Sequence, residues 1–326
     1  MVPKLRLVLA VMVWAPGALA QATPPPDVGA DLSAASAASP RPTECAPEGP
    51  VGESRSAWDG ARRPRLRAYC DALARGYAEL FRAPARAAAS AARARELSPG
   101  SVAPLVLEAR ALVGSGREKE AWPVFLRARS LDKASLGEPA ALHDFALAAL
   151  ASGEHAEAVA AYRALVPRAA LLADPRRRQR VYLEAAMTVL RQEAATLDEA
   201  LGYLGEARRL RGLPGLSDVV LGATALTLDR QGRSEEARGV AAEARGALGV
   251  AKLAGARDRE RVVALPEGEL SAVAAMLAER AHPELARKLW RVFVESPDSA
   301  RSPWLAHAKK KAEGALGVGR RPRKPR

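Results

Sequence analysis

Apolar residues recur every three to four positions from about Trp58 onward, which is the spacing of amphipathic helices, and no alternating strand pattern is evident. Three helical stretches resemble one another: GREKEAWPVFLRARSL from Gly116, GEHAEAVAAYRALV from Gly153 and GRSEEARGVAAEARG from Gly232. Each begins with a glycine, which tolerates the positive φ of a tight turn after a helix. The pattern therefore predicts antiparallel helix pairs, with one glycine at each turn.

The second helix of each predicted pair carries a repeated small and large pattern. A small alanine recurs along the chain at Ala121, Ala158, Ala200, Ala237 and Ala286. Four residues later stand Phe125, Tyr162, Leu204, Ala241 and Trp290, and three residues after those stand Ala128, Leu165, Ala207, Ala244 and Phe293. Offsets of four and three place these positions on one helical face. On the preceding helices, the small residues Ala109, Ala146, Ala225 and Ala274 are expected where the two helices of a pair cross.

This arrangement resembles the tetratricopeptide repeat, whose consensus has a Trp, Leu-Gly and Tyr helix followed by an Ala, Phe and Ala helix. The resemblance covers residues 66–297, although the spacings exceed the family's 34 residues and the Leu-Gly pair is replaced. It implies an all-α, superhelical solenoid of antiparallel helix pairs over 57–316, closed by an amphipathic capping helix at Ser302–Leu316. A general helical repeat or an irregular helical bundle is the alternative.

The first twenty residues have the layout of a secretory signal peptide. Lys4 and Arg6 precede an apolar run, Leu7 to Ala15, that is too short to span a bilayer, and Ala18 and Ala20 form a small-x-small cleavage site. The alternative is a buried N-terminal helix. The chain has no Asn and no Ile, a bias typical of GC-rich genomes. We therefore expect an exported bacterial protein, in the periplasm or alternatively outside the cell.

Residues 21–56 are rich in Pro, Ala, Ser and Gly and lack an apolar period, which predicts a disordered linker. The exported part holds two cysteines, Cys45 and Cys70. An oxidising compartment would permit one disulfide between them, closing a loop of about 25 residues and contributing roughly 3 kcal/mol. The alternative is two unpaired cysteines, with Cys70 buried on a helix.

No pattern of catalytic or cofactor-binding residues stands out. The four histidines, His143, His155, His282 and His307, do not have the helical spacing of metal ligands. Phosphate-binding glycine loops and the nucleophile-elbow motif are also missing. We therefore expect no enzyme, no metal and no small-molecule cofactor.

The resemblance implies a concave groove lined by the first helices of successive pairs. The residues that it places there are Arg110, His143, Leu147, Arg180, Met187, Arg191, Leu226 and Arg230. Arginines alternating with apolar residues suit an acidic, partly hydrophobic peptide. The alternative is that these arginines form a solvated face. Without Asn, the groove cannot carry the Asn-containing carboxylate clamp of co-chaperone members of the family.

The formal charge of +13 is concentrated near the C-terminus. The basic residues there are Lys309, Lys310, Lys311, Arg320, Arg321, Arg323, Lys324 and Arg326, the last five within a tail at 317–326. Such a tail can bind anionic lipid, wall polymer or nucleic acid, or it can be a solvated terminus. The sequence thus favours a non-catalytic scaffold of the bacterial envelope that binds a protein or peptide in its groove. A polyanion-binding protein acting through the tail is the alternative.

Overall fold

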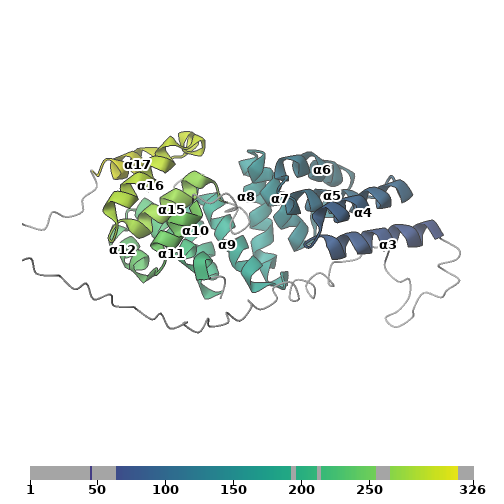
Figure 1. Ribbon diagram of the computed structural model, residues 1–326, viewed down its shortest axis with the longest axis horizontal. Coiled ribbons are helices and arrows are strands. Elements are labelled where there is room, and N and C mark those ends of the chain that lie inside the picture. The colour runs from purple at the N-terminus through teal and green to yellow at the C-terminus, as the bar shows by residue number, and fades with distance from the viewer. Residues whose placement is uncertain (1–44, 46–63, 192–195, 211–213, 255–264, 315–326) are drawn as a thin grey trace, which may run out of the picture.

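The chain forms an elongated row of helices (Figure 1). The computed structural model describes residues 45, 64–191, 196–210, 214–254 and 265–314, and these residues contain fourteen α-helices and no strand. The first eight helices are α3 (Pro64–Glu79), α4 (Pro84–Leu97), α5 (Ala103–Gly114), α6 (Glu118–Leu131), α7 (Pro139–Ala151), α8 (His155–Leu165), α9 (Pro175–Leu190) and α10 (Leu197–Arg209). The others are α11 (Pro214–Arg230), α12 (Ser234–Glu243), α13 (Ala247–Ala254), α15 (Glu267–Ala278), α16 (Pro283–Glu295) and α17 (Leu305–Ala312).

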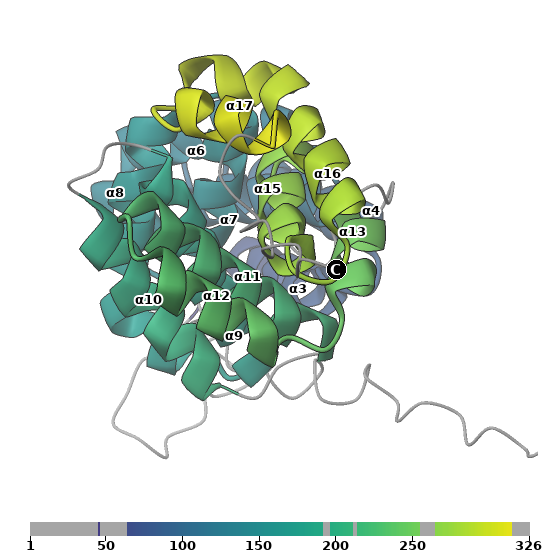
Figure 2. The ribbon, with the colours of Figure 1, turned by 90° about the vertical axis from the view of Figure 1, so that its left-hand side faces the viewer.

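Helices that follow one another in the chain also lie side by side in space. The helices pack in six pairs: α3 with α4, α5 with α6, α7 with α8, α9 with α10, α11 with α12, and α15 with α16. The first helices of successive pairs also touch: α3 contacts α5, α5 contacts α7, α9 contacts α11 and α11 contacts α15. The view along the row shows α17 at the top edge of the C-terminal part, beside α16 (Figure 2). The all-α prediction is confirmed, and the sequential packing is consistent with a helical repeat.

The three predicted turn glycines adopt the expected conformation. Gly116, Gly153 and Gly232 have φ of 73°, 82° and 78°. At the first of them, the Gly116 N–H donates to Val113 O and the Arg117 N–H donates to Leu112 O, at 3.0 and 2.9 Å. These two bonds form the Schellman motif, which satisfies the carbonyl groups at a helix end. The second helix of each of these pairs begins directly afterwards.

The repeated face of the second helices makes up much of the core. The large residues Phe125, Tyr162, Leu204 and Trp290 are all fully buried, as are the alanines Ala109, Ala146, Ala225 and Ala274 at the helix crossings. The pair α11 and α12 departs from the pattern, because Ala241 and Ala244 are only half-buried. α12 ends at Glu243, and the unpredicted short helix α13 follows it. This extra helix accounts for the wider spacing before Ala286.

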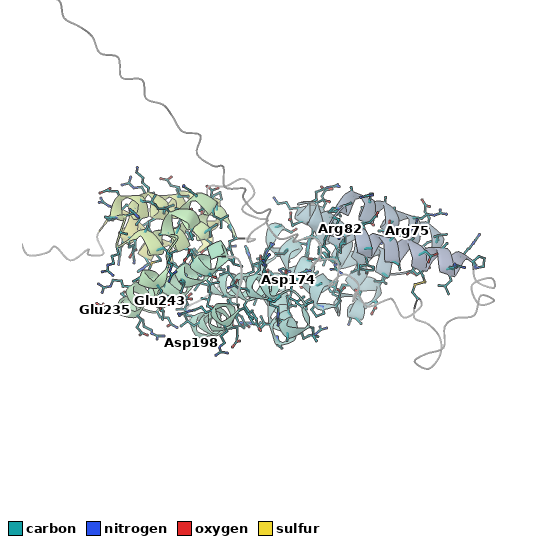
Figure 3. All side chains as sticks on the ribbon, turned by 60° about the horizontal axis from the view of Figure 1, so that its bottom comes forward. Arg75, Arg82, Asp174, Asp198, Glu235 and Glu243 are labelled. Atoms are coloured by element: carbon teal, nitrogen blue, oxygen red, sulfur yellow. A yellow bond between two sulfur atoms is a disulfide. The ribbon has the colours of Figure 1, made fainter. Side chains whose placement is uncertain are left out.

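The cysteines form a disulfide, with Cα atoms 5.6 Å apart, which confirms the predicted pairing (Figure 3). Cys45 is buried in the same apolar cluster as Tyr69 and Leu73 of α3, so the bond holds this residue at the N-terminal end of the row. The expected signal peptide, the rest of the linker and residues 317–326 lie outside the described residues. None of the described helices combines the length and apolar character needed to span a bilayer.

Replacing glycine by alanine is expected to have opposite effects on stability at two positions on neighbouring helices. A Cβ at Gly222 on α11 would lie 2.7 Å from Val273 Cγ1 and 3.0 Å from the Val273 carbonyl oxygen on α15, whereas a Cβ at Gly239 on α12 would meet nothing within 4 Å. We expect Gly222→Ala to lower the free energy of unfolding by about 1–3 kcal/mol through overpacking. Gly239→Ala should raise it by about 0.5–1 kcal/mol, because alanine favours the helix. Urea unfolding followed by circular dichroism measures both changes. A lower free energy of unfolding for Gly239→Ala would contradict the placement of Gly239 in open space.

Candidate functional site

A cavity of about 980 Å³ lies near the middle of the row. Its walls come from the start of α6, the end of α7, one face of α9, the start of α15 and the end of α16. The residues that line it include Leu147, Leu150, Arg180, Met187, Thr188, Arg191, Leu265, Glu269 and Val292. Four of these, Leu147, Arg180, Met187 and Arg191, belong to the set predicted for the groove.

α9 supplies the longest stripe of the cavity wall. It begins at Pro175, and Asp174 caps it by accepting a hydrogen bond from the Arg176 N–H at 2.9 Å. Arg180, Met187 and Arg191 are separated by seven and four residues, so they lie on one face of the helix. The stripe therefore has an apolar centre and a guanidinium group at each end.

The two arginines of this stripe are partly exposed, and the carboxylates that pair with them are buried. The Arg180 side chain is 23% exposed, while Glu184, whose Oε1 accepts from Arg180 Nε at 2.7 Å, is 0% exposed. The Arg191 side chain is 15% exposed, while Glu269, 3.9 Å away, is 1% exposed. Each of the two arginines can therefore donate to a hydrogen-bond-accepting group, while the rim of the cavity also carries the acidic residues Glu120, Glu267 and Glu295.

Glu184 is the centre of a buried polar cluster behind the cavity. Its Oε2 contacts His143 Nε2 at 2.7 Å and accepts a hydrogen bond from the Tyr162 hydroxyl at 3.2 Å. Burial by itself would raise the pKa of Glu184, but the Arg180 charge and the His143 hydrogen bond outweigh burial and hold it well below its ordinary value. The carboxylate therefore stays ionised and ties α7, α8 and α9 together.

His143 is a neutral structural residue in this cluster. Arg177 Nε donates to His143 Nδ1 at 3.3 Å, so the ring proton is on Nε2, which donates to Glu184. Burial lowers the pKa of His143, against the raising effect of Glu184. The prediction that His143 is exposed in the groove is wrong, because its ring fills the contact between α7 and α9.

Arg110 is also buried, contrary to the prediction that it lines an open groove. Its Nη1 donates to Glu138 Oε2 at 2.7 Å and its Nε donates to Asp144 Oδ2 at 2.8 Å. Asp144 in turn accepts from Arg177 Nη2 at 3.0 Å. The same residues thus extend the buried polar cluster from α5 to α9, and their charges are used within the fold.

Leu226 and Arg230, both on α11, complete the corrections to the predicted groove. Leu226 is fully buried in the apolar core, and Arg230 is buried next to Glu269, with 3.6 Å between Arg230 Nη2 and Glu269 Oε2. α11 packs against α9 and α15 at once, so most of its circumference faces other helices. Its side chains therefore have no open groove to line.

Lys311 does not belong with the freely exposed basic residues. Its ammonium group lies 3.0 Å from Asp229 Oδ2 and 2.9 Å from Glu279 Oε1, whereas Lys309 and Lys310 on the same helix are exposed. Asp229 also contacts His307 Nε2 at 2.7 Å. Burial would raise the pKa of Asp229, but the His307 hydrogen bond and the Lys311 charge hold it at about 2.

The sequence interpretation missed most of the cavity rim. The missed segments are Gly116–Glu120, Leu265–Glu269 and Val292–Pro297, which surround helix ends. Pro266 and the glycine turn at Gly116 marked two of these ends in the sequence, but their convergence depends on contacts between distant helices. Among the described residues, no three His, Cys, Asp or Glu side chains are grouped so that they could hold a metal.

Comparison with known proteins leaves the family of this chain open. No family model matches the sequence, and no curated protein is significantly similar to it.

Proposed function

We propose that this chain is an exported, non-catalytic scaffold of the bacterial envelope, which binds a protein or peptide segment in the concave face of a tetratricopeptide-like solenoid. The observation that carries the proposal is the cavity lined by Leu147, Arg180, Met187 and Arg191. The glycine turns and the repeated alanine and aromatic face support the repeat assignment. The disulfide supports an oxidising compartment.

The cavity suits a polypeptide segment that carries both apolar and charged side chains. Its volume of about 980 Å³ is at the upper end of the range of small-ligand pockets, about 300–1,000 Å³. The apolar centre around Met187 and Leu147 can bury one side chain of a partner, while Arg180 and Arg191 can pair with its carboxylates. An open cavity with an apolar centre and separated charged groups of both signs suits a chain segment better than a compact cofactor.

Site-specific photo-crosslinking tests the proposal. A photoreactive amino acid is placed at Val292, at the exposed rim of the cavity, or at Leu131, which is exposed on α6 but does not line it. We expect ultraviolet irradiation of cells to give a discrete polypeptide adduct at Val292 and none at Leu131. Ala151→Trp, which fills part of the cavity, should abolish the adduct, and Arg191→Gln should weaken it about tenfold, equivalent to 1.4 kcal/mol.

The same experiment separates the proposal from the polyanion alternative. An adduct that persists in Ala151→Trp, or that forms equally at Leu131, would contradict binding in the cavity. If truncation after Gly317 removes the adduct, or if the captured material is lipid, wall polymer or nucleic acid, the basic tail is the functional element. Tail-driven binding should also fall steeply between low and moderate salt.

A further inference from the structure

α17 is a short helix that packs through small apolar side chains and several polar contacts. The helix has eight residues, and isolated helices shorter than about 12–15 residues are marginal in water. The buried apolar side chains that it contributes are the small Ala308 and Ala312. Figure 1 and Figure 2 both show it lying beside α16 at the C-terminal end. Its helical state therefore depends on what anchors it to the row.

The anchor is a lysine and a histidine that contact two buried or half-buried carboxylates. Lys311 contacts Asp229 on α11 and Glu279 at the end of α15, at 3.0 and 2.9 Å, and His307 contacts the same Asp229 at 2.7 Å. Ser234 also donates to Asp229 Oδ1 at 3.2 Å. The Lys311 side chain is largely buried and its ammonium lies 5.7 Å from the centre of the Trp290 ring. Loss of the ammonium would leave both carboxylates poorly compensated.

Trp304, just before α17, connects the anchor to the cavity wall. Its Nε1 donates to the carbonyl oxygen of Leu190 at 3.1 Å, and Leu190 directly precedes Arg191. Its ring lies 5.4 Å from the Arg230 guanidinium carbon. Arg230 in turn pairs with Glu269, which lines the cavity. A continuous series of contacts thus runs from α17 to the cavity.

The ion pair beneath Trp304 is incompletely hydrogen-bonded. Both Nη atoms of Arg230 and both carboxylate oxygens of Glu269 are buried and have no hydrogen-bond partner within the described residues. A buried charge pair of this kind is costly unless the surrounding packing holds it in place. Trp304 is part of that packing. Displacing Trp304 would remove part of this packing.

We infer that α17 is a latch, whose docking is coupled to the position of the cavity wall formed by Arg191 and the start of α15. Coupling of this kind is reciprocal. An occupant that draws Glu269 or Arg191 toward itself loosens α17, and a polyanion that pulls on the exposed Lys309 and Lys310 changes the cavity. The inference requires the cavity but does not depend on which molecule occupies it.

Hydrogen exchange measured by mass spectrometry on the mature, disulfide-bonded chain tests the latch. Lys311→Met removes the anchoring ammonium, and Lys310→Met makes the same chemical change one residue away on the exposed face of the helix. We expect Lys311→Met to speed amide exchange in α17 by at least tenfold and in α15 by about fivefold or more. Lys310→Met should leave exchange in both helices as in the parent chain.

A second variant keeps the test decisive if Lys311→Met destabilises the whole chain. Trp304→Phe keeps a ring over Arg230 but removes the donor to Leu190. Faster exchange in both α17 and α15, with α3 and α4 unchanged, supports the latch. Faster exchange in α17 alone, in either variant, would show that α17 is a passive cap, and equal effects of Lys310→Met and Lys311→Met would also overturn the inference.

Discussion

Replacing Glu184 by alanine is expected to lower the free energy of unfolding by about 3–5 kcal/mol, the range for removing one partner of a buried ion pair. The carboxylate is completely buried and contacts Arg180, His143 and the Tyr162 hydroxyl. Without it, the guanidinium loses its balancing charge, and the imidazole N–H and the hydroxyl lose their acceptor inside the protein. The single substitution therefore removes the carboxylate that connects α7, α8 and α9.

Urea unfolding followed by circular dichroism measures this loss, with Glu154→Ala as the matched control. Glu154 is exposed at the start of α8, so its removal should change the free energy of unfolding by no more than about 0.5 kcal/mol. The loss in free energy of unfolding for Glu184→Gln should lie between those of the two alanine variants. The amide still accepts a hydrogen bond but does not balance the charge of Arg180. A loss below about 1 kcal/mol for Glu184→Ala would show that the cluster contributes little.

The helix pairing could be predicted from the sequence because its determinants are local. A glycine with positive φ, an alanine five residues later and a large residue four residues after that lie within about three helical turns. Gly153, Ala158 and Tyr162 show the complete pattern, and each has the predicted role. Local patterns of this kind do not report how many helices surround a given face.

The groove residues were predicted less well for that reason. Spacing correctly put Arg110, His143 and Arg230 on first helices, but it did not show that neighbouring helices cover the faces that carry them. Their partners are distant in sequence: Arg110 and Asp144 are 34 residues apart, and His143 and Glu184 are 41. Arg180 and Glu184, four residues apart, were the pair that sequence spacing alone could have identified.

Charged residues on the outer surface contribute less to stability than buried ones, although the sequence does not distinguish the two groups. Figure 3 labels Arg75 and Arg82 in the N-terminal half of the row, and Asp198, Glu235 and Glu243 in the C-terminal half; all five are exposed. Exposed ion pairs contribute at most about 1 kcal/mol each, whereas breaking a buried pair costs several times more. The stability of the chain therefore depends on its few buried charges far more than on its many exposed ones.

Trp290→Ala is expected to lower the free energy of unfolding by about 3–5 kcal/mol, the usual cost of truncating a buried tryptophan. Trp290 occupies the repeated large position of α16 and is fully buried, with its ring edge-on to Phe293 at 6.3 Å. Its Nε1 also donates to Glu279 Oε1 at 3.0 Å. The substitution therefore removes core packing and frees one of the two carboxylates that hold Lys311.

Trp122→Ala is the matched control for that experiment. Trp122 is half-buried on α6, three residues before the repeated position at Phe125, and it packs against Phe145 with ring centres 5.0 Å apart. Because part of its ring stays in water, its truncation leaves a smaller cavity and should cost roughly half as much as Trp290→Ala. Urea unfolding of the two variants compares them directly. Equal losses would show that the repeated position has no special place in the packing, and that the helix pairs are held together by other contacts.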